Sequence, residues 1–79
     1  MITSDQIRAA RALLRWSAEE LANKAQLGVA TIRRIEADEG VPSSNARTLD
    51  ILQKTLETAG VEFVGTPQDR PGVRKSHNT

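Results

Sequence analysis

The chain of 79 residues has no cysteine, no tyrosine, one tryptophan and one phenylalanine. Without cysteine it can form neither a disulfide nor a thiolate metal site. It also lacks an apolar run long enough to cross a membrane, and its first residues do not have the basic segment and apolar stretch of a signal peptide. We therefore expect a cytoplasmic protein with no membrane partner.

Motifs of catalysis are absent as well. The one histidine, His77, is close to the C-terminus, and the carboxylates of Glu36, Asp38 and Glu39 are crowded together without the spacing of metal ligands. The sequence contains no glycine-rich phosphate loop and no nucleophile motif. We therefore expect no enzyme, no catalytic residue, no metal site and no cofactor.

Neither sign of charge predominates. Eleven basic and ten acidic residues leave a formal net charge of +1, far from the strongly basic balance that by itself indicates a nucleic-acid binder. The distribution of the charges must therefore decide that question. With 79 residues, of which 38% are hydrophobic, the chain can build one core and no second domain.

Two capping boxes predict where the first two helices begin. Thr3 with Gln6, and Ser17 with Glu20, have the spacing of a capping box. The hydroxyl of the first residue can accept the backbone N–H of the second, and the side chain of the second can accept the backbone N–H of the first. The first helix is expected to end near residue 15. The second is expected to begin at residue 18 and to end before Gly28.

Helical periodicity continues in the next segment. Ile32 and Ile35 mark the inner face of a helix of about nine residues, which is too short to be stable unless it packs on its predecessor. After a loop at 38–42, residues 43–45 are candidate caps for a further helix that runs to Gly60. The sequence therefore predicts four helices, with a tight turn between the second and the third.

The segment after the fourth helix favours β-structure. Residues 61–64 alternate apolar and polar side chains, and residues 66–72 hold two prolines and other turn formers before a short returning strand. We interpret 61–75 as a weak hairpin and 76–79 as a disordered tail. The alternative is a loose tail in which Phe63 packs on the core.

Such a hairpin is only marginally stable in water by itself, so it needs the helical body or a second subunit. An exposed strand edge can pair with the same edge of another copy. We therefore expect a homodimer, in which this segment is the dimerisation element. The predicted interface residues are Val61, Glu62, Phe63 and Val64.

The second and third predicted helices carry a distinctive pattern. Its residues are E-E-L-A-x-K-A at 19–25, Leu27, and T-I-R-R-I-E at 31–36. This pattern resembles that of the lambda-repressor-like, Cro/XRE family of helix-turn-helix DNA-binding domains. With the helices before and after it, the resemblance covers residues 2–60.

The resemblance implies a mainly α fold. A four-helix, lambda-repressor-like helix-turn-helix domain is expected at 1–60, and the hairpin at 61–75 stands where a fifth helix commonly follows in the family. Two residues depart from the family pattern. Gln26 replaces the usual glycine of the turn, and Gly28 replaces the usual serine or threonine cap of the third helix.

The resemblance also implies that the third helix enters the DNA major groove. Its arginines are shaped to contact guanine or to clamp phosphate, whereas its first two side chains cannot hydrogen-bond a base and would pack on a thymine methyl. The predicted base-reading residues are Val29, Ala30, Thr31, Arg33 and Arg34.

The starts of the second and fourth helices are expected to hold the DNA backbone, because short polar side chains and free backbone N–H groups bind phosphate. The predicted phosphate contacts are Ser17, Ala18, Ser43, Ser44, Asn45 and Arg47. Arg11 and Glu36 match positions that form an ion pair in the family, so we assign them to structure. Trp16 is assigned to the core and not to nucleic-acid stacking.

Two functions remain open at this stage. The first is a sequence-specific, double-stranded DNA-binding transcriptional regulator, a homodimer that reads an inverted repeat through the major groove and is controlled by a regulatory protein partner or by its own concentration. The alternative is a protein-interaction module of the antitoxin or anti-repressor type. Arg33, Arg34 and the polar residues at 43–47 favour the first, whereas the low net charge and the apolar residues at 29–30 favour the second. We adopt the first.

Overall fold

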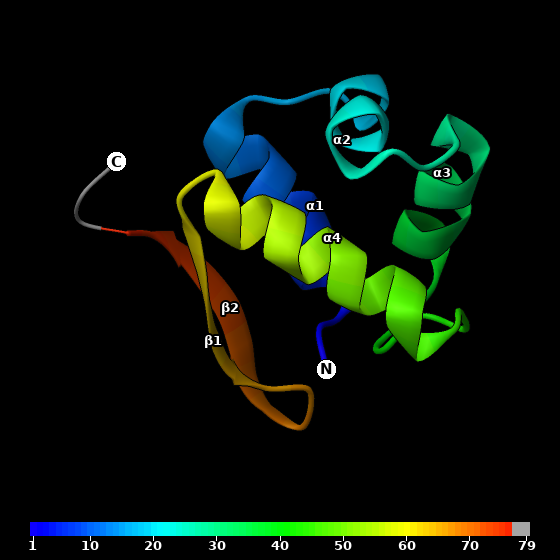
Figure 1. Cartoon of the computed structure of the whole chain (residues 1–79). Coiled ribbons are helices and arrows are strands. Elements are labelled where there is room, and N and C mark those ends of the chain that lie inside the picture. Colours follow the sequence, from blue (N-terminus) through cyan, green and yellow to red (C-terminus); the bar gives the residue numbers. More distant parts are fainter. Residues whose placement is uncertain (77–79) are drawn as a thin grey trace.

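The computed structural model describes residues 1–76, and it contains the four helices and the hairpin expected from the sequence (Figure 1). Figure 1 shows α3 on one side of α4 and the hairpin on the other. The two strands form one antiparallel sheet. The elements are α1 (Ser4–Leu14), α2 (Ala18–Ala25), α3 (Val29–Ala37), α4 (Ala46–Thr58), β1 (Val61–Thr66) and β2 (Asp69–Lys75).

Local side-chain caps fix the starts of three helices. Both predicted capping boxes are formed, with hydrogen bonds of 2.9 and 3.1 Å between Thr3 and Gln6 and of 2.8 and 3.0 Å between Ser17 and Glu20. The side chain of Asn45 accepts the backbone N–H of Thr48 at 2.8 Å, so it is the cap of α4. These bonds satisfy backbone N–H groups that a helix start leaves unpaired.

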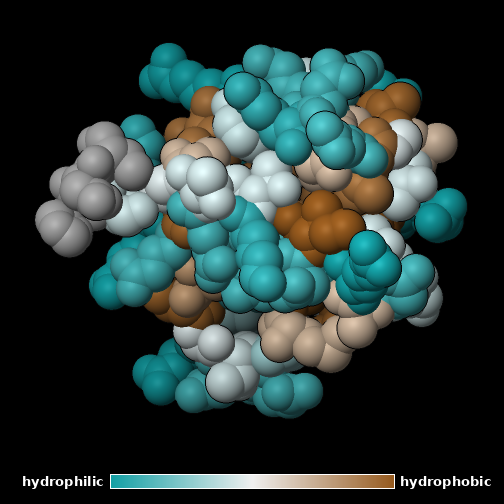
Figure 2. Space-filling model, viewed as in Figure 1, coloured by the Kyte–Doolittle hydropathy of each residue, from teal (hydrophilic) through white to brown (hydrophobic). Residues whose placement is uncertain are grey.

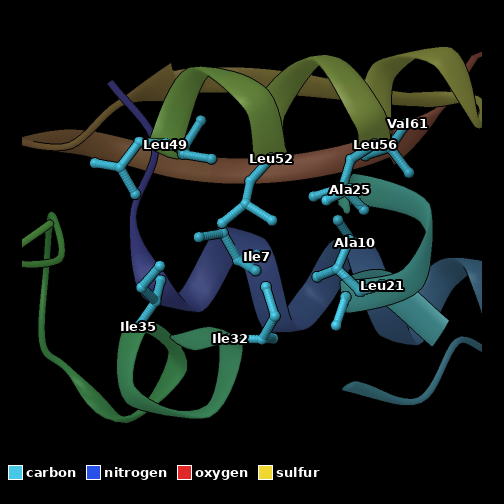
Figure 3. Packing of buried hydrophobic residues seen from close by; sticks show 12 residues of the cluster. Ile7, Ala10, Leu21, Ala25, Ile32, Ile35, Leu49, Leu52, Leu56 and Val61 are labelled. Carbon is cyan, nitrogen blue, oxygen red and sulfur yellow. The ribbon is translucent and has the colours of Figure 1, made fainter. Parts of the chain in front are cut away.

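Buried apolar side chains from all four helices and from β1 meet in one core (Figure 3). Leu52 of α4 points toward Ile7 of α1, and neither side chain has any exposed surface. Burial of this many aliphatic side chains is the main force that holds the short helices together. The core residues are Ile2, Ile7, Ala10, Leu21, Ala22, Ala25, Ile32, Ile35, Leu49, Leu52, Leu56 and Val61.

The hairpin is held by the helical body. Val61 is buried with 1% of its surface exposed, and Phe63 and Val73, which face each other across the two strands, pack against the core. The side-chain amide of Gln6 in α1 donates to backbone carbonyls of both strands, at 3.2 and 2.9 Å. The expectation that Val61 offers an exposed apolar side chain is therefore wrong, because the body needs it as a core residue.

The turn of the hairpin is shorter than predicted. β1 runs to Thr66 and β2 begins at Asp69, so most of the segment 66–72 is strand. Pro71 fits in β2 because an exposed strand of a two-stranded sheet tolerates a missing N–H. The pairing of the two strands is irregular at Gly65, between Val64 and Thr66, and the φ of +77° at this position favours glycine.

The prediction of a disordered tail is wrong for its first residue. The backbone N–H of Ser76 donates to the carbonyl oxygen of Gly60 at 2.9 Å and so closes the base of the hairpin. The rest of that segment, with His77, lies outside the described residues.

Replacing Gly65 with alanine is expected to lower the free energy of unfolding by about 2 kcal/mol or more. An added Cβ would lie 2.2 Å from the carbonyl oxygen of Arg70, and the positive φ is strained for any other residue. Gly40→Ala is the matched control, because its φ is +63° but no atom lies within 4 Å of an added Cβ. Urea titration of both variants tests this, and equal losses would show that the close contact with Arg70 is unimportant.

Candidate nucleic-acid interface

A tight turn sets α3 against α2. Gln26 caps α2 with a left-handed backbone, at φ +58°, and the backbone N–H of Leu27 bonds to the carbonyl oxygen of Ala22 at 2.9 Å. The side chain of Leu27 packs against the core. Gly28 then begins α3 without a side-chain cap. The turn therefore forms with Gln26 in place of the family's usual glycine and with Gly28 in place of its usual serine or threonine cap.

The outer side of α3 is available to a ligand. Ile32 and Ile35 are buried against the body, while Ala30, Arg33 and Arg34 are exposed. Because 3.6 residues complete a helical turn, these exposed positions share the side opposite the core. An exposed helix of this length can enter a major groove about 12 Å wide.

Two of the predicted base-reading residues are less available than the sequence suggested. Val29 and Thr31 are half-buried, and Val29 packs partly against the core. Only part of the Val29 side chain is therefore left for contact with a thymine methyl.

The two arginines of α3 differ in their partners. Arg33 forms an ion pair with Glu19 of α2, with 2.6 Å between Nη2 and Oε2, and both side chains are about 60% exposed. Arg34 has no carboxylate partner within residues 1–76. Arg34 is therefore free to meet an anion or a base, whereas Arg33 must first give up or share Glu19.

The N-terminus of α4 brings part of the predicted phosphate site together. Arg47 is exposed and has no carboxylate partner in the described part of the chain. The backbone N–H groups of Ala46 and Arg47 lie in the first turn, where no earlier helical carbonyl can accept them. A helix start with two such N–H groups and a cation nearby is suited to an anion.

Other predicted phosphate donors are already in use. The backbone N–H of Ser43 donates to Asp38 at 2.8 Å, and that of Ser44 donates to the Pro42 carbonyl at 2.9 Å. The expectation of free backbone N–H groups at these two serines is therefore wrong, because the loop before α4 uses them to fold on itself.

The start of α2 is similarly occupied in part. The backbone N–H and the hydroxyl oxygen of Ser17 both serve the capping box with Glu20. The hydroxyl proton of Ser17 and the backbone N–H of Ala18 have no part in that capping box. These are the groups with which the start of α2 can hold a phosphate.

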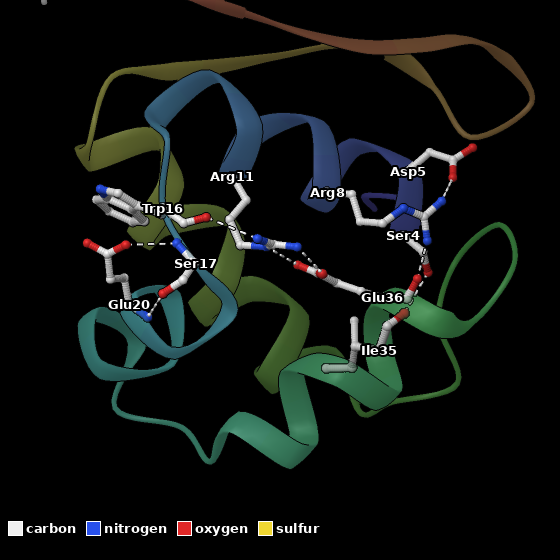
Figure 4. Close-up of polar contacts among 9 residues, drawn as sticks. All are labelled: Ser4, Asp5, Arg8, Arg11, Trp16, Ser17, Glu20, Ile35 and Glu36. Carbon is white, nitrogen blue, oxygen red and sulfur yellow. Dashed lines mark hydrogen bonds and ion pairs between the residues drawn. The ribbon is translucent and has the colours of Figure 1, made fainter.

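An ion pair anchors the end of α3 to α1 (Figure 4). Arg11 binds Glu36 through two hydrogen bonds of 2.9 and 2.8 Å, and its third nitrogen donates to the Trp16 carbonyl at 3.0 Å. The hydrogen bond with Glu36 raises the pKa of the Arg11 guanidinium, against a smaller lowering by burial. The structural role assigned to this pair is confirmed.

Two further bonds strengthen this anchor. The hydroxyl of Ser4, which is fully buried, donates to the Ile35 carbonyl at 2.8 Å. Arg8 donates to the carbonyl oxygen of Glu36 and also binds Asp5. Three side chains of α1 therefore fix the last turn of α3, and with it the orientation of the exposed arginines.

Within residues 1–76, no group of three or more histidine, cysteine, aspartate or glutamate side chains could hold a metal ion. In the same part of the chain, no helix combines the length and the apolar character that a membrane span requires. Trp16 is half-buried against the core, as predicted.

The short turn between α2 and α3 and the exposed outer side of α3 define a helix-turn-helix protein. A family model described as HTH_3, helix-turn-helix, matches residues 7–62, which is more than half of the chain. The chain therefore belongs to this Cro/C1-type family of DNA-binding helix-turn-helix regulators. No curated protein matches it. The match does not favour an antitoxin or anti-repressor module.

Proposed function

We propose that the protein is a sequence-specific transcriptional regulator whose homodimer reads an inverted repeat in double-stranded DNA. The observation that carries this proposal is Arg34, which is exposed on the outer side of α3 and has no carboxylate partner within residues 1–76. An unpaired arginine on a helix of this kind is suited to the O6 and N7 atoms of guanine.

The other exposed residues of α3 have smaller roles in this proposal. Ala30 and the accessible part of Val29 pack on thymine methyl groups, and Thr31 contacts a base or a phosphate. Arg33 reaches the DNA only after it releases or shares Glu19, which is itself repelled by phosphate. Most of the direct reading therefore falls to Arg34.

The starts of α2 and α4 hold the DNA backbone on either side of α3. Arg47 and the N–H groups of the first turn of α4 provide the main contact, supported by the hydroxyl groups of Ser43 and Ser44 and by the amide of Asn45. At α2, Ser17 and Ala18 contribute in the same way. Such contacts set the position of α3 in the groove and carry no sequence information themselves.

The outer edges of the hairpin are the proposed dimer contact, through Glu62, Phe63 and Val64. Met1, at 71% exposure, is the only large hydrophobic residue that is more than half-exposed among residues 1–76, and on the face that Figure 2 shows the apolar surface is divided into separate patches. The large apolar side chains of residues 1–76 therefore leave little exposed surface for a dimer of the free protein. We expect the dimer to form on DNA, where two half-sites add their affinity.

The shape of the molecule is compatible with this arrangement. The hairpin lies on the side of the body away from α3 (Figure 1), and the longest dimension of the molecule is 31 Å. Two recognition helices in successive major grooves are about 34 Å apart. A two-fold axis at the hairpin side can therefore place both helices on one face of the DNA.

Selection of binding sites from random duplex DNA with the full chain tests the proposal. We expect an inverted repeat whose half-sites are separated by about one helical turn of DNA, and sedimentation should find two copies on that repeat and one on an isolated half-site. Recovery of no motif would contradict sequence-specific reading. Recovery of a single half-site bound by one copy would contradict the homodimer but not sequence-specific reading.

Replacing Arg47 with alanine is expected to weaken binding to all duplexes alike and to make the dependence of log affinity on log salt shallower by about one. The loss is uniform because a phosphate contact carries no sequence information. Arg70→Ala is the control, since that exposed arginine lies at the tip of the hairpin and pairs with its neighbour Asp69. A sequence-dependent loss in the Arg47 variant would make Arg47 a base-reading residue.

A further inference from the structure

An open groove lies where the C-terminal ends of α1 and α4 meet. Two adjoining hollows of about 630 and 240 Å³ form it, and Leu14 and Ala59 belong to the walls of both. Its apolar floor also includes Trp16, the only tryptophan of the chain. No residue of α3 lines the groove. The groove is thus separate from the proposed DNA-reading surface.

Every charged side chain that lines the groove is a cation. The four cations are Arg15, which directly follows α1, Lys24 of α2, Lys54 of α4 and Lys75 of β2. The Lys24 ammonium lies 5.8 Å from the centre of the Trp16 ring, so a positive charge stands directly beside the apolar floor.

These cations are mostly unneutralised. Lys54 binds Asp50 at 3.2 Å, but Arg15, Lys24 and Lys75 have no carboxylate partner in the part of the chain that the structure describes. Only two other arginines or lysines share this property within residues 1–76, and both belong to the proposed DNA contacts. The unpaired positive charge outside the DNA surface is therefore gathered around this one groove.

We propose that the groove binds an acidic, amphipathic segment of a partner protein. An apolar side chain of that segment would rest on Leu14 and Trp16, and its carboxylates would face Arg15, Lys24 and Lys75. An apolar centre with a charged rim is the usual arrangement of a protein interface, and complementary charge selects the partner.

Two other occupants fit less well. A second copy of the chain in a symmetric contact would bring two cationic rims together, which is repulsive. A DNA backbone would meet the cations but would leave the floor of Leu14, Trp16 and Ala59 without an apolar partner. An acidic protein segment satisfies both the floor and the rim.

The position of the groove allows it to be occupied while DNA is bound. Arg47 lies at the start of α4 and Ala59 at its end, about 18 Å apart along the helix at 1.5 Å per residue. A DNA backbone held at the start of α4 therefore leaves the other end open. The groove would join the partner to the DNA-bound regulator.

Selection of short random peptides on the immobilised full chain tests this proposal. We expect the recovered peptides to combine an aromatic or large aliphatic residue with an excess of aspartate and glutamate, and to change the emission of Trp16 on binding. The double variant Lys24→Glu/Lys75→Glu should bind them at least about tenfold more weakly. The control Arg34→Glu/Arg47→Glu, which changes the net charge by the same amount at the proposed DNA contacts, should bind them as the parent does.

Each of the other outcomes would overturn the proposal. Recovery of neutral or basic peptides, recovery of none, or equal binding by the double variant would exclude an acidic segment in this groove. Weaker binding of every DNA duplex by the double variant than by an Arg70→Glu/Arg74→Glu control would assign the groove to DNA. Sedimentation of the free parent as a dimer, and of the double variant as a monomer, would assign it to a second copy.

Discussion

Replacing Glu36 with alanine is expected to lower the free energy of unfolding by about 2 to 3 kcal/mol. The variant leaves Arg11 charged and without its carboxylate at the junction of α1 and α3, where the two side chains are only 25% and 8% exposed. Because Arg11 keeps some access to water, the expected loss is smaller than the roughly 3 to 5 kcal/mol found when a fully buried pair is broken. Urea titration followed by the emission of Trp16 measures it.

Asp50→Ala is the matched control for this experiment. It breaks the ion pair with Lys54, whose two side chains are 59% and 72% exposed, so a loss below about 1 kcal/mol is expected. The double variant Arg11→Met/Glu36→Leu should recover part of the stability, because it leaves no unpaired charge behind. If Glu36→Ala costs no more than Asp50→Ala, the ion pair does not hold α3 to α1.

The helix starts could be predicted from the sequence because the chemistry that sets them is local. A capping box needs only two side chains three residues apart, and both boxes are found where the sequence placed them. The same is true of α3, whose boundaries follow from the helical period between Gly28 and the loop after Ala37. No long-range contact was needed for these predictions.

The hairpin was predicted less fully, because its detail depends on contacts distant in sequence. The alternation at 61–64 indicates a strand but does not say whether its apolar side faces the body or a partner. The burial of Val61 and the bonds from Gln6, 58 and 66 residues away from its acceptors, decide this in favour of the body. The composition of residues 66–72 also predicted too long a turn, because Pro71 is compatible with an exposed strand.

For the candidate site, the sequence identified the helix but could not rank its arginines. Glu19 and Arg33 are 14 residues apart, and they meet only because α2 and α3 cross at the turn. The cations of the groove are spread from Arg15 to Lys75, so no motif indicates them. Such groupings depend on packing and become visible only in three dimensions.

Replacing Arg34 with alanine is expected to weaken binding to the selected DNA site by about 1 to 3 kcal/mol, which is roughly fivefold to 150-fold, with the fold intact. The exposed arginine has no carboxylate partner within residues 1–76, so its removal leaves the body undisturbed while a guanine loses two hydrogen bonds. Titration of the selected duplex and of a scrambled duplex of equal length measures the loss. The loss of affinity should be confined to the selected duplex.

Arg33→Ala is the control that separates the two arginines. Its loss should be smaller than that of Arg34→Ala, because Arg33 must first leave Glu19 before it can reach the DNA. Glu19→Gln releases Arg33 and removes the repulsion, so this variant should bind scrambled DNA more tightly and discriminate less. If the Arg34 variant binds the selected site as tightly as the parent, α3 does not read the DNA through Arg34. If Arg33→Ala costs more, the pair with Glu19 positions Arg33 for base contact.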